Sequence, residues 1–392
     1  MSIMKKILGA VVLCGTLLWM VGRAYATDLS VRIFSEKPSA AYVFTAALGV
    51  YYIFDSEEQR LVELHEDQSV TLRVEAENIA VWQGDSLLGV FPSLSLDGEG
   101  LKAIFAIHPE GAPGEVRYYD DHLEVGVENG RLFLINVVNV ENYVAGVTQS
   151  EVRSISDKLD FYKIQAIIAR TYAINNLRRH ANGGYHLCDG VHCQVYKSRN
   201  NTPLILTATV QTAGALIVDT ADQVITASFY SNSGGETVAS EDVWRYEIPY
   251  LRPVRDTFSM SMRNAFWVKE MSRKEWLDFL ERQYNYPVKN ATMRDSALTF
   301  KQIRRKVYFP NQIPLKNIRQ DLNLRSTYFS VSTQGDQVRL TGRGYGHGVG
   351  LSQEGAVRMV DLGYSVEDVI RFYYTGVSIK HMDQLSIGDL SD

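Results

Sequence analysis

Residues 130–152 read GRLFLINVVNVENYVAGVTQSEV, a stretch that begins as an apolar run and ends beside an acid, Glu151. The run from Leu132 to Val140 is β-branched and free of charge, which predicts a buried strand. One short helical turn is expected to follow it and to reach Glu151. A strand that leads directly into helical sequence indicates that the two kinds of element share one core.

The next segment, residues 157–180, reads DKLDFYKIQAIIARTYAINNLRRH, and its apolar residues recur at helical spacing from Leu159 to Leu177. This periodicity predicts an amphipathic helix running toward His180. Earlier in the chain, short β-branched and aromatic runs alternate with polar or glycine turns, as they do in strands. We therefore expect an α+β fold, in which mixed strands and helices frame a cleft next to a β-rich N-terminal region.

The length of 392 residues is enough for two packed units. We expect a signal peptide over residues 1–26, the β-rich region over 27–126 and the main domain over 127–392, with a variable, insert-like region at 255–335. A basic segment at 300–324 is expected to be a solvated face and not a binding site. The net charge of −5 gives no broad basic surface, so nucleic-acid binding is set aside.

The first residues resemble an export signal. Lys5 and Lys6 precede an apolar run from Ile7 to about Val21, and Ala24-Tyr25-Ala26 offers a cleavage site. The alternative is an uncleaved anchor helix, although the run is short for a bilayer span. We expect an exported protein, periplasmic or otherwise outside the cytoplasm, that contacts a membrane only through this segment.

Two histidines and two cysteines lie within eight residues in YHLCDGVHCQVY, residues 185–196. His186, Cys188, His192 and Cys193 would supply the mixed nitrogen and sulfur ligands that tetrahedral zinc takes. A disulfide between the two cysteines is the alternative in an oxidising compartment, and unpaired side chains are a third possibility.

Other polar residues stand where chemistry is possible. Glu151 follows a strand and precedes a long helix, although an exposed or capping glutamate would look the same. Arg170 interrupts an apolar stretch, so it should have an anionic or carbonyl partner, or a head that reaches water. Ser231 and Ser233 lie in a polar loop with two glycines, which suits hydrogen bonding to a hydroxyl-rich ligand but also an ordinary turn.

The segment GRGYGHGVGLSQ, residues 342–353, alternates glycine with larger residues. Such a pattern costs backbone entropy, and packing alone explains it poorly. No Lys-Ser or Lys-Thr pair follows, so a phosphate loop is disfavoured. His347 would be reachable from a cleft, although a plain loop histidine is equally compatible with the sequence.

Several of these segments, taken in order, resemble the stage II sporulation protein D family, whose domain also occurs in proteins named amidase enhancers. The matching stretches cover roughly residues 132–379 and include VNVENYVAGVTQSEV, KIQAIIARTYAI, CDGVHCQVY, SFYSNSGGET and GRGYGHGVGLSQEGAVRMVDLGYSVEDVIRFYYTGV. The family usually has Met-Pro after its essential glutamate, whereas this chain has Val152-Arg153.

The resemblance implies a lytic transglycosylase that cuts peptidoglycan glycan strands stripped of their stem peptides by a partner N-acetylmuramoyl-L-alanine amidase. The essential glutamate maps onto Glu151, and the family's zinc ligands map onto the histidine and cysteine cluster. An apolar cleft wall would raise the pKa of this acid toward neutrality. Expected sugar contacts are Arg170, placed on the substrate and not paired with the acid, and Tyr172, Ser231, Ser233, His347 and Gln353.

Three functional hypotheses follow. The first is a transglycosylase that uses one glutamate as acid and then as base. The second is a non-catalytic, glycan-binding activator of a cell-wall amidase. The third, a zinc hydrolase, is disfavoured because four protein ligands would leave no position for a water on the metal.

Overall fold

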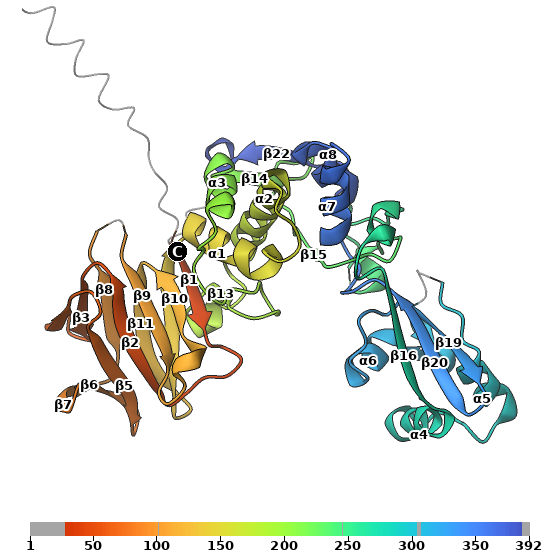
Figure 1. Ribbon diagram of the computed structural model, residues 1–392, viewed down its shortest axis with the longest axis horizontal. Coiled ribbons are helices and arrows are strands. Elements are labelled where there is room, and N and C mark those ends of the chain that lie inside the picture. Colours follow the sequence, from red (N-terminus) through yellow and green to blue (C-terminus); the bar gives the residue numbers. More distant parts are fainter. Residues whose placement is uncertain (1–27, 101, 245, 304–306, 386–392) are drawn as a thin grey trace, which may run out of the picture.

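The computed structural model describes residues 28–100, 102–244, 246–303 and 307–385. Figure 1 shows a β-strand unit, a central helical body and a small sheet with its own helices, which follow one another along the molecule. The α+β fold expected from the sequence is confirmed. The expected signal or anchor segment, residues 1–26, lies outside the described residues. Within the described part of the chain, no helix is both long enough and apolar enough to cross a membrane.

The β-strand unit consists of two sheets that pack around one apolar core. The first has the order β13-β1-β12-β11-β8-β3-β4 and contains β1 (Asp28–Ile33), β3 (Tyr51–Asp55), β4 (Arg60–Leu64), β8 (Leu94–Gly98), β11 (His122–Glu128), β12 (Arg131–Asn139) and β13 (Leu187–Cys188). The second has the order β10-β9-β2-β5-β6-β7 and contains β2 (Ala41–Leu48), β5 (Ser69–Glu75), β6 (Asn78–Gln83), β7 (Ser86–Phe91), β9 (Ile104–Pro109) and β10 (Arg117–Asp120).

The N-terminal unit extends further than the sequence indicated. The boundary expected after residue 126 falls inside β11, and β12 pairs with both β1 and β11 in the same sheet. The buried strand predicted from Leu132 onward is therefore present, but it belongs to the N-terminal unit. It carries the chain straight from this sheet into the first helix.

The central body contains most of the helices. They are α1 (Val140–Val152), α2 (Leu159–Asn175), α3 (Pro203–Gln211), α7 (Gln353–Asp361) and α8 (Val366–Tyr373), and two short strand pairs join them: β14 (Ala215–Val218) with β22 (Ser378–His381), and β15 (Phe229–Tyr230) with β21 (Leu351–Ser352). α1 is a helix of 13 residues and not the single turn that was predicted. The side chain of Asn139 accepts a hydrogen bond from the Glu141 amide and so caps its first turn.

A small α+β unit, residues 266–343, leaves the central body and returns to it. It contains β16 (Phe266–Ser272), α4 (Arg273–Tyr284), α5 (Ala291–Leu298), β17 (Tyr308–Phe309), β18 (Ile313–Pro314), α6 (Leu315–Asp321), β19 (Phe329–Gln334) and β20 (Gln337–Arg343). Its sheet has the order β16-β20-β19, and its separate core surrounds the fully buried Trp276. This unit begins and ends later than the insert-like segment expected at 255–335.

The loop that carries the cysteines returns to the N-terminal unit. Its strand β13 pairs in parallel with β1, with Leu187 opposite Val31 and Cys188 opposite Arg32. The next residue, Asp189, is fully buried and accepts hydrogen bonds from the amides of Phe34, at 2.9 Å, and of Ser35, at 3.1 Å. Because a buried carboxylate is stable only when it is hydrogen-bonded, these contacts hold the loop on the N-terminal sheet.

The segment that follows this loop, residues 195–201, lies along the second half of α1. The amide of Lys197 donates to Ser150 Oγ at 3.2 Å, and the amide of Asn201 donates to Gln149 Oε1 at 2.8 Å. Gly146 makes this approach possible, since a Cβ there would lie 2.5 Å from the Tyr196 ring and 2.8 Å from the Ser198 carbonyl oxygen. The glycine is therefore required by close packing.

We expect Gly146→Ala to lower the free energy of unfolding by about 1–3 kcal/mol, because the added methyl must push a backbone segment away from the helix. In a helix without this contact, replacing glycine by alanine would raise stability by about 1 kcal/mol. A loss of stability in Gly146→Ala would therefore show that residues 195–201 pack tightly on the helix. Urea unfolding measures it. Gly126→Ala is the control, because nothing lies within 4 Å of its Cβ position. Equal or higher stability of Gly146→Ala would show that the contact is loose.

Candidate functional site

Glu151 lies in the last turn of α1 and lines a cleft of about 840 Å³. Its Oε1 accepts a hydrogen bond of 2.8 Å from the Val195 amide, in the segment packed on the helix. Burial raises the pKa of this carboxyl, and the hydrogen bond from Val195 offsets part of the rise. The group can therefore keep its proton at a higher pH than an exposed glutamate.

The cleft is formed by segments that are far apart in the sequence. It lies between the ends of α1 and α2, the cysteine loop, the strand around β15, the segment near Trp244 and the glycine loop. The residues that line it are Glu151, Ile155, Tyr172, Asn176, Arg179, Val191, His192, Cys193, Val195, Thr226, Ser228, Phe229, Tyr230, Ser231, Trp244, Ile248, Tyr345, Gly346, His347 and Gln353. Among these described residues, Glu151 is the only carboxylic acid. One acid therefore faces a mixed aromatic and polar wall.

The glycine-alternating loop packs its backbone against the strand around β15. Gly344 and Gly350 have left-handed φ values of 74° and 77°. A Cβ at Gly344 would lie 2.5 Å from the Asn232 carbonyl oxygen, and one at Gly350 would lie 2.1 Å from the Ser228 carbonyl oxygen. The alternation thus allows a close backbone approach, with Tyr345 and His347 in the cleft wall and Val349 in the core.

His347 lines the cleft, but backbone groups use both of its ring nitrogens. Nδ1 accepts a hydrogen bond from the Val349 amide at 3.1 Å, and Nε2 lies 3.0 Å from the Phe229 carbonyl oxygen, to which it donates. The ring also lies 5.7 Å from that of Trp244, centre to centre. His347 consequently offers a ring surface, and its nitrogens are held by the fold.

The other residues expected to contact sugar divide into two groups. Tyr172, Ser231 and Gln353 line the cleft, as does His347. Arg170 does not: it is fully buried, and its guanidinium forms two hydrogen bonds with the Glu141 carboxylate, at 2.8 and 2.5 Å. The placement of Arg170 on the substrate was wrong, because a charge inside the core needs a carboxylate partner and finds it at the start of α1.

Ser233 is also a structural residue. It is fully buried, and its hydroxyl donates to Asp256 at 2.7 Å and lies 2.7 Å from the hydroxyl of Ser259. Burial raises the pKa of Asp256, and the hydrogen bond from Ser233 counteracts that rise. The expected sugar contact at Ser233 was wrong, because its hydroxyl serves this internal network.

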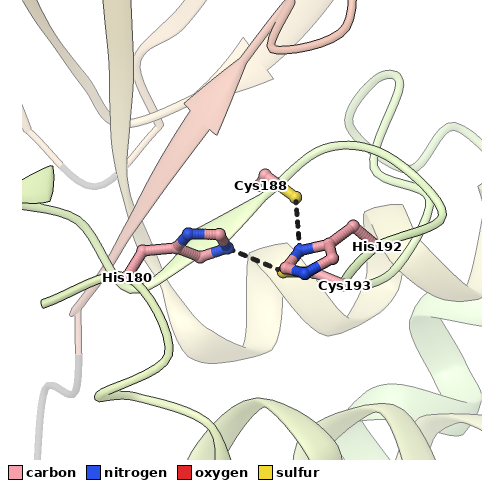
Figure 2. Close-up of side chains that lie close together, drawn as sticks. All are labelled: His180, Cys188, His192 and Cys193. Atoms are coloured by element: carbon pink, nitrogen blue, oxygen red, sulfur yellow. Dashed lines mark hydrogen bonds between the residues drawn. The ribbon is translucent and has the colours of Figure 1, made fainter.

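Four side chains of the kinds that bind metals gather next to residues 195–201, and two of them, His192 and Cys193, line the cleft. Figure 2 shows His180, Cys188, His192 and Cys193 turned toward one another, and their ligand atoms all lie within 4.8 Å. His180 Nε2 is 3.3 Å from the sulfur of Cys193, and His192 Nδ1 is 3.8 Å from that of Cys188. Bonds of about 2.0–2.3 Å to a tetrahedral zinc place ligands roughly 3.3–3.8 Å apart, so the donor set fits this ion.

One member of the predicted ligand set was wrong. His186 stays outside the cluster, since its Nδ1 accepts a hydrogen bond from the Ser30 amide at 3.1 Å and its own amide donates to the Ser30 carbonyl oxygen. His180 takes its place. His180 lies five residues after the end of α2 at Asn175. A short turn at Ala181–Gly183 follows it and reverses the chain, so that the His180 ring stacks on that of Tyr185 with 4.6 Å between ring centres.

The aromatic wall of the cleft was not anticipated from the sequence. Trp244 and Tyr230 flank the ring of His347, and Tyr345 lines the cleft two residues before it. Tyr345 occupied an alternating position of the glycine loop, just as His347 did, and this pattern could have identified it. Trp244 carried no comparable signal.

Comparison with known proteins supports one family. A family model described as a stage II sporulation protein matches residues 128–226, which contain Glu151 and the four clustered histidines and cysteines. Proteins named stage II sporulation protein D from Bacillus amyloliquefaciens and Bacillus subtilis strain 168 are 31% and 30% identical over 264 and 267 residues. Each alignment covers 63% of this chain, and they cover 75% and 76% of the respective relatives.

A more distant relative is the amidase enhancer of Bacillus subtilis strain 168, which is 25% identical over 287 residues, 60% of this chain and 40% of the enhancer. The family resemblance inferred from the ordered motifs is thus confirmed by both the family model and the relatives. This chain belongs to the stage II sporulation protein D family.

Proposed function

We propose that this protein is a lytic transglycosylase of peptidoglycan, with Glu151 as its catalytic residue. The names of its relatives, a sporulation protein and an amidase enhancer, support a role related to the cell wall. The observation that carries the finer proposal is the single carboxyl group among the described residues of the cleft, with a pKa raised by burial. A glycosidase that hydrolyses its substrate ordinarily needs two carboxyl groups, whereas this reaction needs one.

The reaction proceeds in two steps at one carboxyl group. Protonated Glu151 donates its proton to the oxygen that joins N-acetylmuramic acid to N-acetylglucosamine, and the C1–O bond breaks. The resulting carboxylate then removes the proton from the C6 hydroxyl of the muramic acid, whose oxygen bonds to C1. A 1,6-anhydro ring forms, Glu151 regains its proton and no water is consumed.

The cleft wall holds the strand in this proposal. Tyr172 and Ser231 offer hydroxyl groups for the sugar hydroxyls and N-acetyl groups. Gln353 also lines the cleft, but it is largely buried, and its amide nitrogen lies 3.4 Å from Gln165 Oε1. Trp244 and the ring of His347 offer apolar surface against which sugar faces pack. The amide of Val195 already orients Glu151, so the acid needs little rearrangement before the reaction.

We also propose that His180, Cys188, His192 and Cys193 hold a structural zinc ion. Four protein ligands complete its shell, so the ion supplies rigidity and no activated water. A hydrogen bond between the two thiols lowers the pKa of Cys188 and raises that of Cys193, so without a metal the pair favours one thiolate, and zinc would have to displace the second proton. His192 and Cys193 also line the cleft, and Val195 follows two residues later, so the ion would fix the wall that orients Glu151.

The proposed setting is outside the cytoplasm, on glycan strands from which an N-acetylmuramoyl-L-alanine amidase has removed the peptides. An amidase is a functional partner in this scheme, as the name of the amidase enhancer suggests. That name also favours a second candidate function, a glycan-binding activator without catalysis. The exposed Arg153, which replaces the family's usual proline after the glutamate, is the local feature that favours it.

We expect Glu151→Gln to lower the rate of strand cleavage by about 10²–10⁴-fold, because the variant can neither donate nor accept the proton. Mass spectrometry of digested, peptide-free strands measures the anhydro-muramic ends. Glu247→Gln, at an exposed glutamate, is the control and should retain full activity. An unchanged yield of ends in Glu151→Gln would contradict the proposal. Absence of cleavage by the unmodified protein, together with faster amidase turnover, would favour the activator.

The same variant supplies its own folding control. Since the pKa of Glu151 is higher in the folded state than the ordinary 4.5, stability falls as pH rises through the interval between these two values. Glutamine does not titrate, so Glu151→Gln should gain stability relative to the unmodified protein between pH 4 and neutral pH. Urea unfolding at both pH values checks that lost activity is not lost folding.

We expect His180→Ala to weaken zinc binding by more than about 100-fold, since loss of an outer partner of a metal ligand alone costs about 10–100-fold. His186→Ala is the matched control and should keep its zinc, because that ring contacts the Ser30 amide. Metal analysis of purified variants and competition with a chelator measure both. Zinc retained in His180→Ala but lost in His186→Ala would restore the ligand set first inferred from the sequence.

A further inference from the structure

We propose that Arg325 and Arg343, with the aromatic rings beside them, extend the cleft and bind the free carboxylates of a glycan strand. The proposal rests on the proposed function, since it states how the substrate of the same cleft is held beyond the bond that is cut. It concerns the junction between the glycine loop and the small α+β unit, where β20 leads into the cleft wall.

Arg325 lies at the cleft edge and is held in place there. Its guanidinium carbon lies 5.8 Å from the ring centre of Tyr345, which lines the cleft. Its Nη1 donates to Asn264 Oδ1 at 3.2 Å, and the Asn264 amide nitrogen donates to the buried Glu354 at 2.6 Å. A half-buried amide, itself held by the buried Glu354, therefore orients an exposed guanidinium, which lowers the entropic cost of binding an anion.

Arg343 continues this surface onto the open face of the sheet. Its guanidinium carbon lies 5.8 Å from the ring centre of Phe266, its partner in β16, and 5.6 Å from that of Tyr328. The side chain of Phe266 is 53% exposed although it is large and apolar. Only Gly344 separates Arg343 from Tyr345 in the chain, and Arg343, Tyr345 and Phe266 are all exposed, so Arg343 stands on the strand that leads into the cleft wall.

The charge of these two arginines is not balanced locally. Neither forms an ion pair with a carboxylate among the residues that the structure describes. Arg339, four residues before Arg343 on the same strand, does pair with Glu270 across the sheet. In a chain with a net charge of −5, two exposed guanidinium groups beside exposed rings complement a ligand that has both carboxylates and apolar faces.

A peptidoglycan glycan strand carries carboxylates directly on its sugars, next to their apolar faces, only after its peptides are removed. Each muramic acid then carries one free lactyl carboxylate, whereas an attached peptide converts that group to a neutral amide. The apolar faces of the sugars pack on Phe266 and Tyr345, and the carboxylates meet Arg325 and Arg343. The extension consequently selects peptide-free strands by the position of their carboxylates on the sugars, in addition to any steric exclusion of the peptides.

Binding measurements on the non-cleaving Glu151→Gln protein test this extension. Two probes are compared by calorimetry: peptide-free strands, and the same strands with their lactyl carboxylates converted to amides. We expect about tenfold tighter binding of the free-carboxylate strands. Adding Arg325→Gln and Arg343→Gln together should remove this difference by weakening only the free-carboxylate complex, also about tenfold. Arg339→Gln, on the same sheet, is the matched control and should change neither affinity.

An unchanged preference in the double variant, or equal weakening for both probes, would overturn the extension. With Glu151 intact, the double variant should raise KM for peptide-free strands and leave kcat nearly unchanged, because neither arginine touches the reacting atoms. If Glu151→Gln abolishes cleavage but the arginine substitutions leave both affinities unaltered, only the extension fails. If Glu151→Gln still cleaves, the proposed function fails, while the dissociation constants continue to decide the extension.

Discussion

The packing of residues 195–201 on α1 is the contact on which the rest of the site depends. It is possible because Gly146 leaves no side chain between the helix and the backbone of Ser198. From this contact follow the hydrogen bond from Val195 to Glu151 and the partial burial that raises the pKa of the acid. The environment of the Glu151 carboxyl thus depends on the absence of a side chain at Gly146, about one and a half helical turns earlier on α1.

The N-terminal β unit takes part in the same arrangement. β13 adds to its first sheet beside β1, and the buried Asp189 binds the backbone of the turn after β1. Between these anchors and the segment packed on α1 lies the loop with His192 and Cys193, whose side chains line the cleft. A unit that the motifs did not cover therefore positions one wall of the site, because the loop is tied to it at one end and to the helix at the other.

Local pattern was a good guide where a residue's role depends on its neighbours in the chain. The strand before α1, the start of α2 and the glycine loop were predicted from periodicity and spacing, and Glu151, Tyr172, Ser231, His347 and Gln353 all line the cleft as expected. The length of α1 was underestimated, since polar residues on its exposed side interrupt the apolar pattern that marks a helix.

Errors arose where a partner is distant in sequence. Arg170 and Ser233 looked available to a substrate, but Glu141 and Asp256 already satisfy them inside the core. His186 was assigned to the cluster because it lies two residues before Cys188, and His180 was not considered. The structure brings His180 in because α2 ends at Asn175 and the chain folds back. The aromatic wall and the arginines beside it come from segments that only the fold brings together.

The central claim is that one carboxyl group acts first as acid and then as base. Its most direct test is whether oxygen from water enters the new ends of the glycan strands. Peptide-free strands would be digested in water enriched in heavy oxygen, and the new ends would be weighed by mass spectrometry. If Glu151 works alone, every new muramic end is a 1,6-anhydro ring that contains no heavy oxygen. Reducing ends that carry heavy oxygen would show that water attacked C1, and would contradict the single-carboxyl mechanism.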